Sequence, residues 1–196
     1  MKSKFLYFLL TVSGFAFGQE AEKNIAAARQ AYEAGKLEDS RFAMEQVLRE
    51  LDLAIGKEIM AELPPKIGPF AAVSGGDVIT AAGSGLGLVL GKKYGTEAKG
   101  LHLDIINNSP LIAGINTILS LPIAGLGNPD QKQVKVQGYK ALLTRHASAE
   151  TGKVDFDVQV PIGNTLLTLH AIDANEAEVL SYAQVIPVAK VAQLGQ

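Results

Sequence analysis

The spacing of apolar residues changes at Leu63-Pro64-Pro65, and this change divides the chain into two kinds of structure. Before the prolines, over about residues 20–62, apolar residues recur every three or four positions, which is the period of an amphipathic helix. From Pro69 onward, apolar and polar residues alternate between glycine-rich turns, which is the pattern of β-strands. Because proline lacks an amide proton and disfavours helical geometry in the residue before it, we expect the helical part to end here.

The helical part, residues 19–65, is predicted to form a hairpin of two antiparallel helices. Gly35 interrupts the apolar pattern, and glycine readily takes the left-handed conformation that ends a helix. The positions expected to form the buried stripe are Ile25, Ala28, Tyr32, Leu37, Met44, Val47, Leu48, Leu51, Ile55 and Ile59. The stretch AYEAGKLEDSRFAMEQVL resembles the middle of a tetratricopeptide repeat. Because such repeats need several units to bury a core, a single match favours a solitary hairpin.

Residues 66–196 are predicted to form an antiparallel α+β domain. Strands are expected around Val78 and Thr80 and in the runs GLVLGKKYG, GLHLDII, QVKVQG, YKALLTRHA, KVDFDVQVP and NTLLTLHAI. Helices are expected from Pro110 to about Leu121, and again after a cap at Asp173 or Asn175. Short turns join the strands, whereas a parallel crossover needs a dozen or more residues. The predicted fold class is therefore α+β, with a mainly antiparallel sheet flanked by helices.

The first eighteen residues follow the three-part pattern of a secretory signal peptide. Lys2 and Lys4 provide the positive start, and the apolar core that follows, about eight residues long, is too short to span a bilayer. Ala16 and Gly18 place small residues where a signal peptidase reads the chain, so cleavage is expected after Gly18. The mature protein is then expected to be periplasmic or secreted, with no transmembrane span.

The composition argues against several classes of protein. Removal of Lys2 and Lys4 with the signal changes the formal net charge from −2 to −4, and no cluster of Lys and Arg is present to neutralise nucleic-acid phosphates. Cysteine is absent, which excludes disulfides, thiolate metal sites and a cysteine nucleophile. A chain of this length, rich in Leu, Ile, Val and Ala, is sufficient for one core of its own.

The order of elements resembles the sandwich of the photosystem PsbP family and its bacterial relatives. The segment from about Ser109 to Gln196 also resembles an uncharacterised family of exported bacterial proteins. The shared features are Ser109-Pro110-Leu111 before the helix, Gly138-Tyr139-Lys140-Ala141-Leu142 after it, and an acidic C-terminal helix. This resemblance covers a little under half of the chain and implies the α+β fold and export. It carries no catalytic motif, so it implies no activity.

The run Gly83-Ser84-Gly85-Leu86-Gly87 is similar in composition to a phosphate-binding loop, but it fails both established patterns. A dinucleotide fingerprint needs glycine at Leu88, and a P-loop needs glycine at Leu86 and Ser or Thr at Lys93. No helix pattern follows the run, whereas a bound phosphate usually lies at a helix N-terminus. The run is interpreted as a hairpin turn, and no cofactor is predicted.

The histidines are the next candidates for chemistry. His102 shares a predicted strand face with Asp104, while His170 shares one with Thr168. If those two strands were neighbours, His102, Asp104 and His170 would offer ligands that suit zinc or copper. No pair of histidines has the sequence spacing typical of a metal site, however. The histidines are therefore interpreted as solvent-facing, and no metal site is predicted.

Asp155 and Asp157 lie two positions apart on a predicted strand, so their carboxylates share a face. Such a pair can share a proton or bind a cation. Because Lys153 lies beside them and they alternate with apolar residues, the pair is interpreted as part of a solvated sheet face.

The segment 110–126 contains seventeen residues without a charged side chain. Its length and Pro122 argue against a membrane span, and the lack of flanking Lys or Arg argues against an interfacial anchor. Two interpretations stay open, namely burial against the sheet or exposure as a docking surface for a partner or lipid.

These observations favour a non-enzymatic periplasmic binding or interaction module that needs no cofactor. Its ligand is expected to be a protein partner or a small apolar molecule, bound through the hairpin or a face of the sheet. Two alternatives stay open. One is an envelope-associated factor that docks through the apolar helix, and the other is an enzyme whose site is assembled from distant residues such as His102, Asp104, Asp155 and His170.

Overall fold

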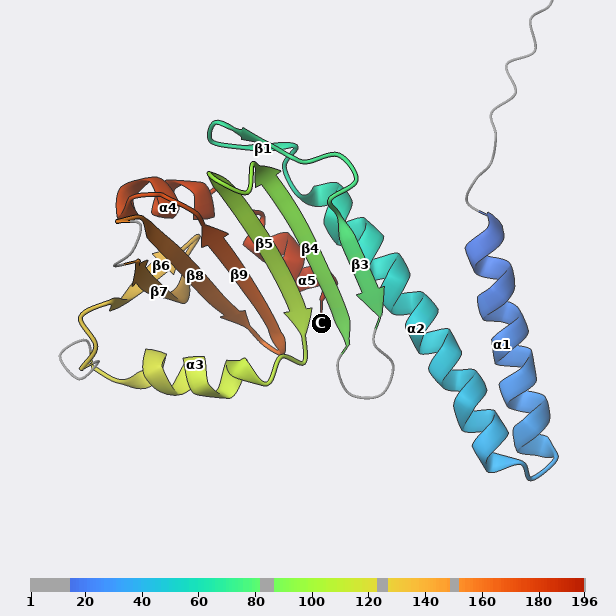
Figure 1. Ribbon diagram of the computed structural model, residues 1–196. Coiled ribbons are helices and arrows are strands. Elements are labelled where there is room, and N and C mark those ends of the chain that lie inside the picture. Colours follow the sequence, from blue (N-terminus) through green and yellow to red (C-terminus); the bar gives the residue numbers. More distant parts are fainter. Residues whose placement is uncertain (1–14, 82–86, 123–126, 149–151, 196) are drawn as a thin grey trace, which may run out of the picture. The chain divides into compact units, whose positions relative to one another are not determined.

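The computed structural model describes residues 15–81, 87–122, 127–148 and 152–195. The chain divides into two compact units, residues 1–50 and 51–196, with the boundary inside a long helix. The fold class is α+β, as predicted: a helical hairpin is followed by an antiparallel sheet flanked by helices (Figure 1). Most of the expected signal peptide, and the glycine-rich run before Gly87, lie outside the described residues.

Two helices form the N-terminal hairpin, α1 (Phe15–Glu33) and α2 (Leu37–Glu62). The chain reverses between them at Gly35, as predicted, with a φ of 72°. Glycine enters this left-handed region without the steric cost that a Cβ atom imposes. Among the helices of the described residues, none is long and apolar enough to cross a membrane.

Small residues, rather than large ones, are buried in the hairpin of the first unit. Ala28, Ala43 and Val47 are buried, and the Ser40 hydroxyl donates a hydrogen bond of 2.8 Å to the carbonyl oxygen of Ala28. Because these side chains are small, the two helices bury little apolar area between them. The predicted buried stripe is therefore wrong for most of its larger members. Those found exposed are Ile25, Tyr32, Leu37, Met44 and Leu48 in this unit and Leu51 directly after it.

The second half of α2 belongs to the sheet unit, and here the predicted stripe is correct at Ile59, whereas Leu51 is exposed. Ile59 is fully buried in the main core of this unit, together with Leu63 at the end of the helix. A Cβ atom at Gly56 would come within 2.8 Å of Ile79 and 2.9 Å of Leu88. The glycine thus lets the helix lie directly on the strands.

Nine strands follow the hairpin in the described part of the chain. The first two, β1 (Lys66–Ile67) and β2 (Phe70–Ala71), pair as a small ribbon that the sequence pattern does not predict. The other seven correspond to the predicted strands and form one antiparallel sheet in the order β3-β4-β5-β9-β8-β7-β6. Their bounds are β3 (Val78–Ala81), β4 (Leu88–Gly95), β5 (Gly100–Asn107), β6 (Gln131–Val136), β7 (Tyr139–Ala147), β8 (Val154–Ile162) and β9 (Thr165–Ala171).

One face of the sheet carries the main core. Successive side chains on a strand point to opposite faces, so Leu103, Val158 and Leu169 lie on this face together. The second half of α2, α4 (Glu176–Ala183) and α5 (Val188–Leu194) contribute buried residues to the same core. Asn175 caps α4 through a reciprocal pair of hydrogen bonds with Glu178, which confirms one of the two predicted caps.

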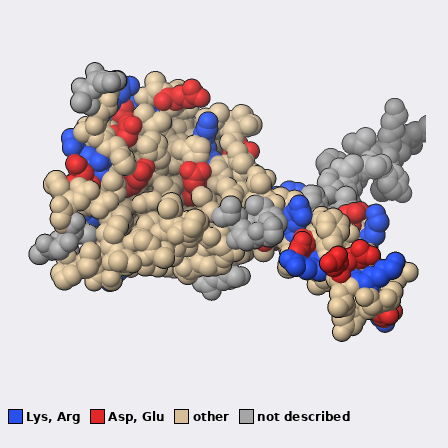
Figure 2. All heavy atoms as spheres, turned by 60° about the horizontal axis from the view of Figure 1, so that its bottom comes forward, with Lys and Arg blue, Asp and Glu red and all other residues tan. Residues whose placement is uncertain are grey.

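The opposite face is partly covered by α3 (Leu111–Ser120), which corresponds to the predicted apolar helix. Ile115 and Leu119 are buried in a second core with Leu142 and Leu166 from the sheet. Leu111, on another side of the helix, is exposed. Figure 2, in which the α3 side comes forward, shows a broad surface without charged side chains in this region. The helix therefore buries one stripe against the sheet and leaves an uncharged side exposed, and docking of a partner or lipid on that side stays a prediction.

Candidate functional site

The three histidines lie on the same face of the sheet, the one opposite to the main core. Strands β5 and β9 are neighbours, and His102 pairs directly with His170 in their register. On the next two strands, Asp157 pairs with His170, and His146 pairs with Asp155. We call this surface the histidine–aspartate face, and it consists of His102, Asp104, His146, Asp155, Asp157 and His170.

Asp157 lies between two imidazole rings. One carboxylate oxygen, Oδ1, is 2.6 Å from His170 Nδ1, and the other, Oδ2, is 2.8 Å from His146 Nε2. An ionised carboxylate only accepts hydrogen bonds, so each ring nitrogen that faces it donates. A separate pair lies on β5, where His102 Nε2 is 2.9 Å from Asp104 Oδ1.

These contacts shift two pKa values in opposite directions. Burial alone would raise the pKa of Asp157, but the hydrogen bonds from His170 and His146 and the charges of both rings outweigh it, so the pKa lies below its usual value. The hydrogen bond to Asp157 raises the pKa of His170 against the opposing effect of burial, and the charges of Asp155 and Asp104 add to the increase. The pair therefore favours an ionised carboxylate and a protonated ring.

A metal site on these residues would require β5 and β9 to be adjacent, and they are: His102 and Asp104 lie on β5 and His170 lies on β9. Their ring nitrogens and carboxylate oxygens are nevertheless used by one another in imidazole–carboxylate pairs. Metal coordination needs several lone pairs that converge on one point. Within the described ranges, no group of three or more His, Cys, Asp or Glu residues has such an arrangement.

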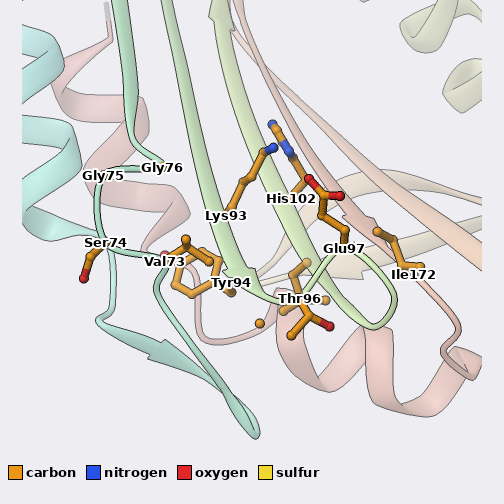
Figure 3. Close-up of a pocket in the computed structure, with 12 residues that line it drawn as sticks. Val73, Ser74, Gly75, Gly76, Lys93, Tyr94, Thr96, Glu97, His102 and Ile172 are labelled. Carbon is orange, nitrogen blue, oxygen red and sulfur yellow. The ribbon is translucent and has the colours of Figure 1, made fainter.

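A pocket of about 400 Å³ lies where β4 turns into β5, at one end of the same face (Figure 3). Lys93 and His102, which pair directly across β4 and β5, line it together with Ile172. The loop 73–76 forms one rim, and the turn with Thr96 and Glu97 forms another. The pocket and the histidine–aspartate face thus share His102.

Backbone hydrogen bonds fix the two rims. The Val73 amide donates to the carbonyl oxygen of Lys93 at 2.9 Å, and the Thr96 amide donates to that of Lys99 at 3.1 Å. Gly75 has a φ of 73°, so the loop between β2 and β3 turns sharply at a residue without a Cβ atom. These contacts hold the loop and the turn in place on either side of the pocket.

The two lysines at this end of β4 have different surroundings. Lys92 is buried on the core side, and its Nζ lies 3.4 Å from Asp77 Oδ2. Lys93 points to the other face and is exposed. Neither Lys93 nor Glu97 forms an ion pair or a side-chain hydrogen bond with any residue in the described part of the chain. Two opposite charges therefore lie at the pocket without a partner among the described residues.

Sequence reasoning found only part of this site. It identified His102, Asp104, His170 and the Asp155–Asp157 pair as candidates, but it missed the contacts of Asp157 and the whole pocket. His146 was detectable only through its place on the polar side of β7, which is a weak signal. Comparison of the chain with protein-family models, curated proteins and solved structures finds no match.

Proposed function

We propose that this protein is a non-enzymatic binding module that holds a small, mainly apolar molecule in the pocket beside Lys93 and His102. The observation that carries this proposal is the pocket itself. Its volume of about 400 Å³ lies within the range of roughly 300–1,000 Å³ that small-molecule sites occupy. Val73 and Ile172 provide apolar surface, and a few polar groups at the rim are available to orient the ligand.

The test is to ask whether the full chain, purified under gentle conditions, retains a small molecule that depends on this pocket. Native mass spectrometry of the wild-type protein is expected to show a bound mass. Val73→Trp places a large ring in the pocket and is expected to remove that mass. Val185→Trp is the matched control, because Val185 is also exposed and does not line the pocket.

Equal retention of the molecule by the Val73→Trp variant would contradict a role for this pocket. Loss from both tryptophan variants would indicate a general effect of the substitution, and it would count against the assignment as well. A circular dichroism spectrum of each variant, compared with the wild type, checks that the fold is preserved.

We propose in addition that the chain is exported and processed after Gly18. The support comes from Lys2, Lys4 and the small residues Ala16 and Gly18, which follow the pattern that a signal peptidase reads. Mass analysis of protein isolated from the periplasmic fraction is expected to show Gln19 as the first residue. Native protein that still begins at Met1 would contradict both export and the periplasmic compartment.

A second candidate function is general acid–base catalysis on the histidine–aspartate face. The observation that favours it is the strand order, which brings His102, Asp104 and His170 together beside Asp157. Imidazoles oriented by carboxylates can transfer protons near neutral pH. Hydrolysis of a panel of simple esters and phosphodiesters is then expected to fall strongly in His170→Ala. Equal rates for the wild type and this variant would exclude the candidate for those substrates.

A further inference from the structure

The polar groups of the pocket carry both signs of charge. Figure 3 shows the side-chain ends of Lys93, His102 and Glu97 gathered on one side of the pocket. Lys93 and Glu97 come from different elements, one from β4 and the other from the β4–β5 turn, and they form no ion pair with each other. A ligand between them would therefore meet an ammonium group and a carboxylate that are both available.

A ligand with a single charge suits this arrangement poorly. An anion placed at Lys93 would also lie near the carboxylates of Glu97 and Asp104, and a cation placed at Glu97 would lie near Lys93. Juxtaposed like charges lower the affinity of the wrong ligand, whereas complementary charges select the right one. A molecule with one charge of each sign satisfies both pocket residues at once.

The rest of the pocket suits an apolar body. Val73 and Ile172 lie to either side of the polar groups (Figure 3), and the Val73 side chain is 38% exposed. Contact with a ligand would remove this exposed apolar surface from water, which is favourable in proportion to the area covered.

We propose that the ligand is a small zwitterion, with a carboxylate at Lys93, an ammonium group at Glu97 and an apolar side chain between Val73 and Ile172. The proposal rests on the binding function assigned to this pocket above and specifies its ligand class. Free apolar amino acids and short apolar peptides share this chemistry. His102 lies beside Lys93 in the strand register, and its Nε2 is held by Asp104.

The test is calorimetric titration of the full chain with probes that differ in one group at a time. L-leucine carries both charges, 4-methylpentanoate lacks the ammonium group, 3-methylbutan-1-amine lacks the carboxylate, and 3-methylbutan-1-ol carries neither charge. Leucyl-leucine distinguishes a peptide from a free amino acid. We expect leucine or leucyl-leucine to bind at least about tenfold more tightly than either singly charged probe, since each charge-assisted hydrogen bond adds substantially to affinity.

Two variants assign the charges to residues. Lys93→Met is expected to weaken leucine binding about tenfold and to leave the amine unaffected or better bound. Glu97→Gln is expected to weaken leucine binding while 4-methylpentanoate binds equally well or better. Lys135→Met and Glu58→Gln are the matched controls, because both residues are exposed in the sheet unit and neither lines the pocket. Neither control is expected to change any affinity.

The outcomes separate this proposal from the binding function on which it rests. If the alcohol or a singly charged probe binds as tightly as leucine, and Val73→Trp blocks that binding, the zwitterion proposal fails and the binding pocket stands. Equal weakening of every probe by Lys93→Met would also overturn the charge assignment. If no probe binds and the purified protein retains no ligand, both proposals fail.

Discussion

In the first unit, large apolar side chains of the hairpin such as Leu48 are exposed, whereas in the sheet unit the same residue type, for example Leu103, is buried. Both leucines belong to regular apolar patterns in the sequence. The difference lies in what each pattern meets. The hairpin helices contact each other through alanine and valine side chains. The core face of the strands, by contrast, is covered by α4, α5 and the second half of α2. A periodic pattern thus identifies the element but not the amount of burial.

The largest effect is expected from a truncation in the sheet core. Leu103→Ala removes a side chain that is 1% exposed and leaves a cavity against β-strands on both sides. The expected loss of unfolding free energy is about 2–5 kcal/mol. Urea unfolding followed by circular dichroism measures it, and a loss below about 1 kcal/mol would show that this core is loosely packed.

A smaller effect is expected where α2 lies on the sheet. Gly56→Ala adds a Cβ atom that would meet Ile79 and Leu88 at less than 3 Å, so we expect destabilisation by about 1–3 kcal/mol despite the better helix propensity of alanine. Gly114→Ala in α3 is the matched control, because nothing lies within 4 Å of the added atom. That variant is expected to gain up to about 1 kcal/mol. The same unfolding experiment compares the two, and a stabilised Gly56→Ala would contradict the close contact.

The pair of Asp157 and His170 is expected to make stability depend on pH. Because the pKa of Asp157 is lowered from its usual value of 3.8, the folded state gains stability that is fully present above pH 3.8. This stability is lost as the pH falls through the lowered pKa. Because the pKa of His170 is raised from its usual value of 6.5, the folded state gains stability that is fully present below pH 6.5. This stability is lost as the pH rises through the raised pKa. Both contributions are therefore fully present between pH 3.8 and 6.5.

Asp157→Asn is expected to lower the pKa of His170 and to flatten the pH dependence of the melting temperature. NMR titration of the His170 ring measures the pKa directly. Asp155→Asn is a graded control, since Asp155 acts on His170 by charge alone and its removal is expected to lower the pKa less. An unchanged His170 pKa in Asp157→Asn would contradict the hydrogen bond between the two.

The smallest effect is expected on the hairpin. Leu48 and Leu51 are 57% and 51% exposed, so Leu48→Ala and Leu51→Ala are expected to change the unfolding free energy by no more than about 0.5 kcal/mol. The same urea experiment applies. A loss of about 2 kcal/mol or more in either variant would show that another surface covers these leucines in solution, and it would remove the contrast with the buried leucines of the sheet.

Sequence patterns were sufficient for most of the secondary structure. Alternation predicted all seven strands of the large sheet, and Gly35 and Asn175 marked the ends of helices. The ribbon of β1 and β2 escaped prediction, because two-residue strands are too short to show a period. The helix α5 after Pro187 also escaped, since proline at that point indicates an end rather than a new start.

The candidate site was less predictable than the strands that carry it. The pattern placed His102 and His170 correctly on strand faces, but nothing local specifies that β5 and β9 are neighbours, since Asn107 and Thr165 are 58 residues apart. The pocket depends on the path of the loop 73–76 over β4, which is set by backbone hydrogen bonds rather than by side-chain pattern. Pairing between distant segments is thus the information that the sequence pattern lacks.

The strand order also has a consequence for the order of folding. Strands β3 to β5 form one meander and β6 to β9 form another, and within each the partners are close along the chain. The two meanders are joined by the pairing of β5 with β9. The chain between these two strands is a long loop, and closing a long loop is slower than closing a hairpin. During synthesis, β9 leaves the ribosome after every other strand. His102 therefore meets His170 only once the chain is almost complete, and the two halves of the sheet expose unpaired edges until then.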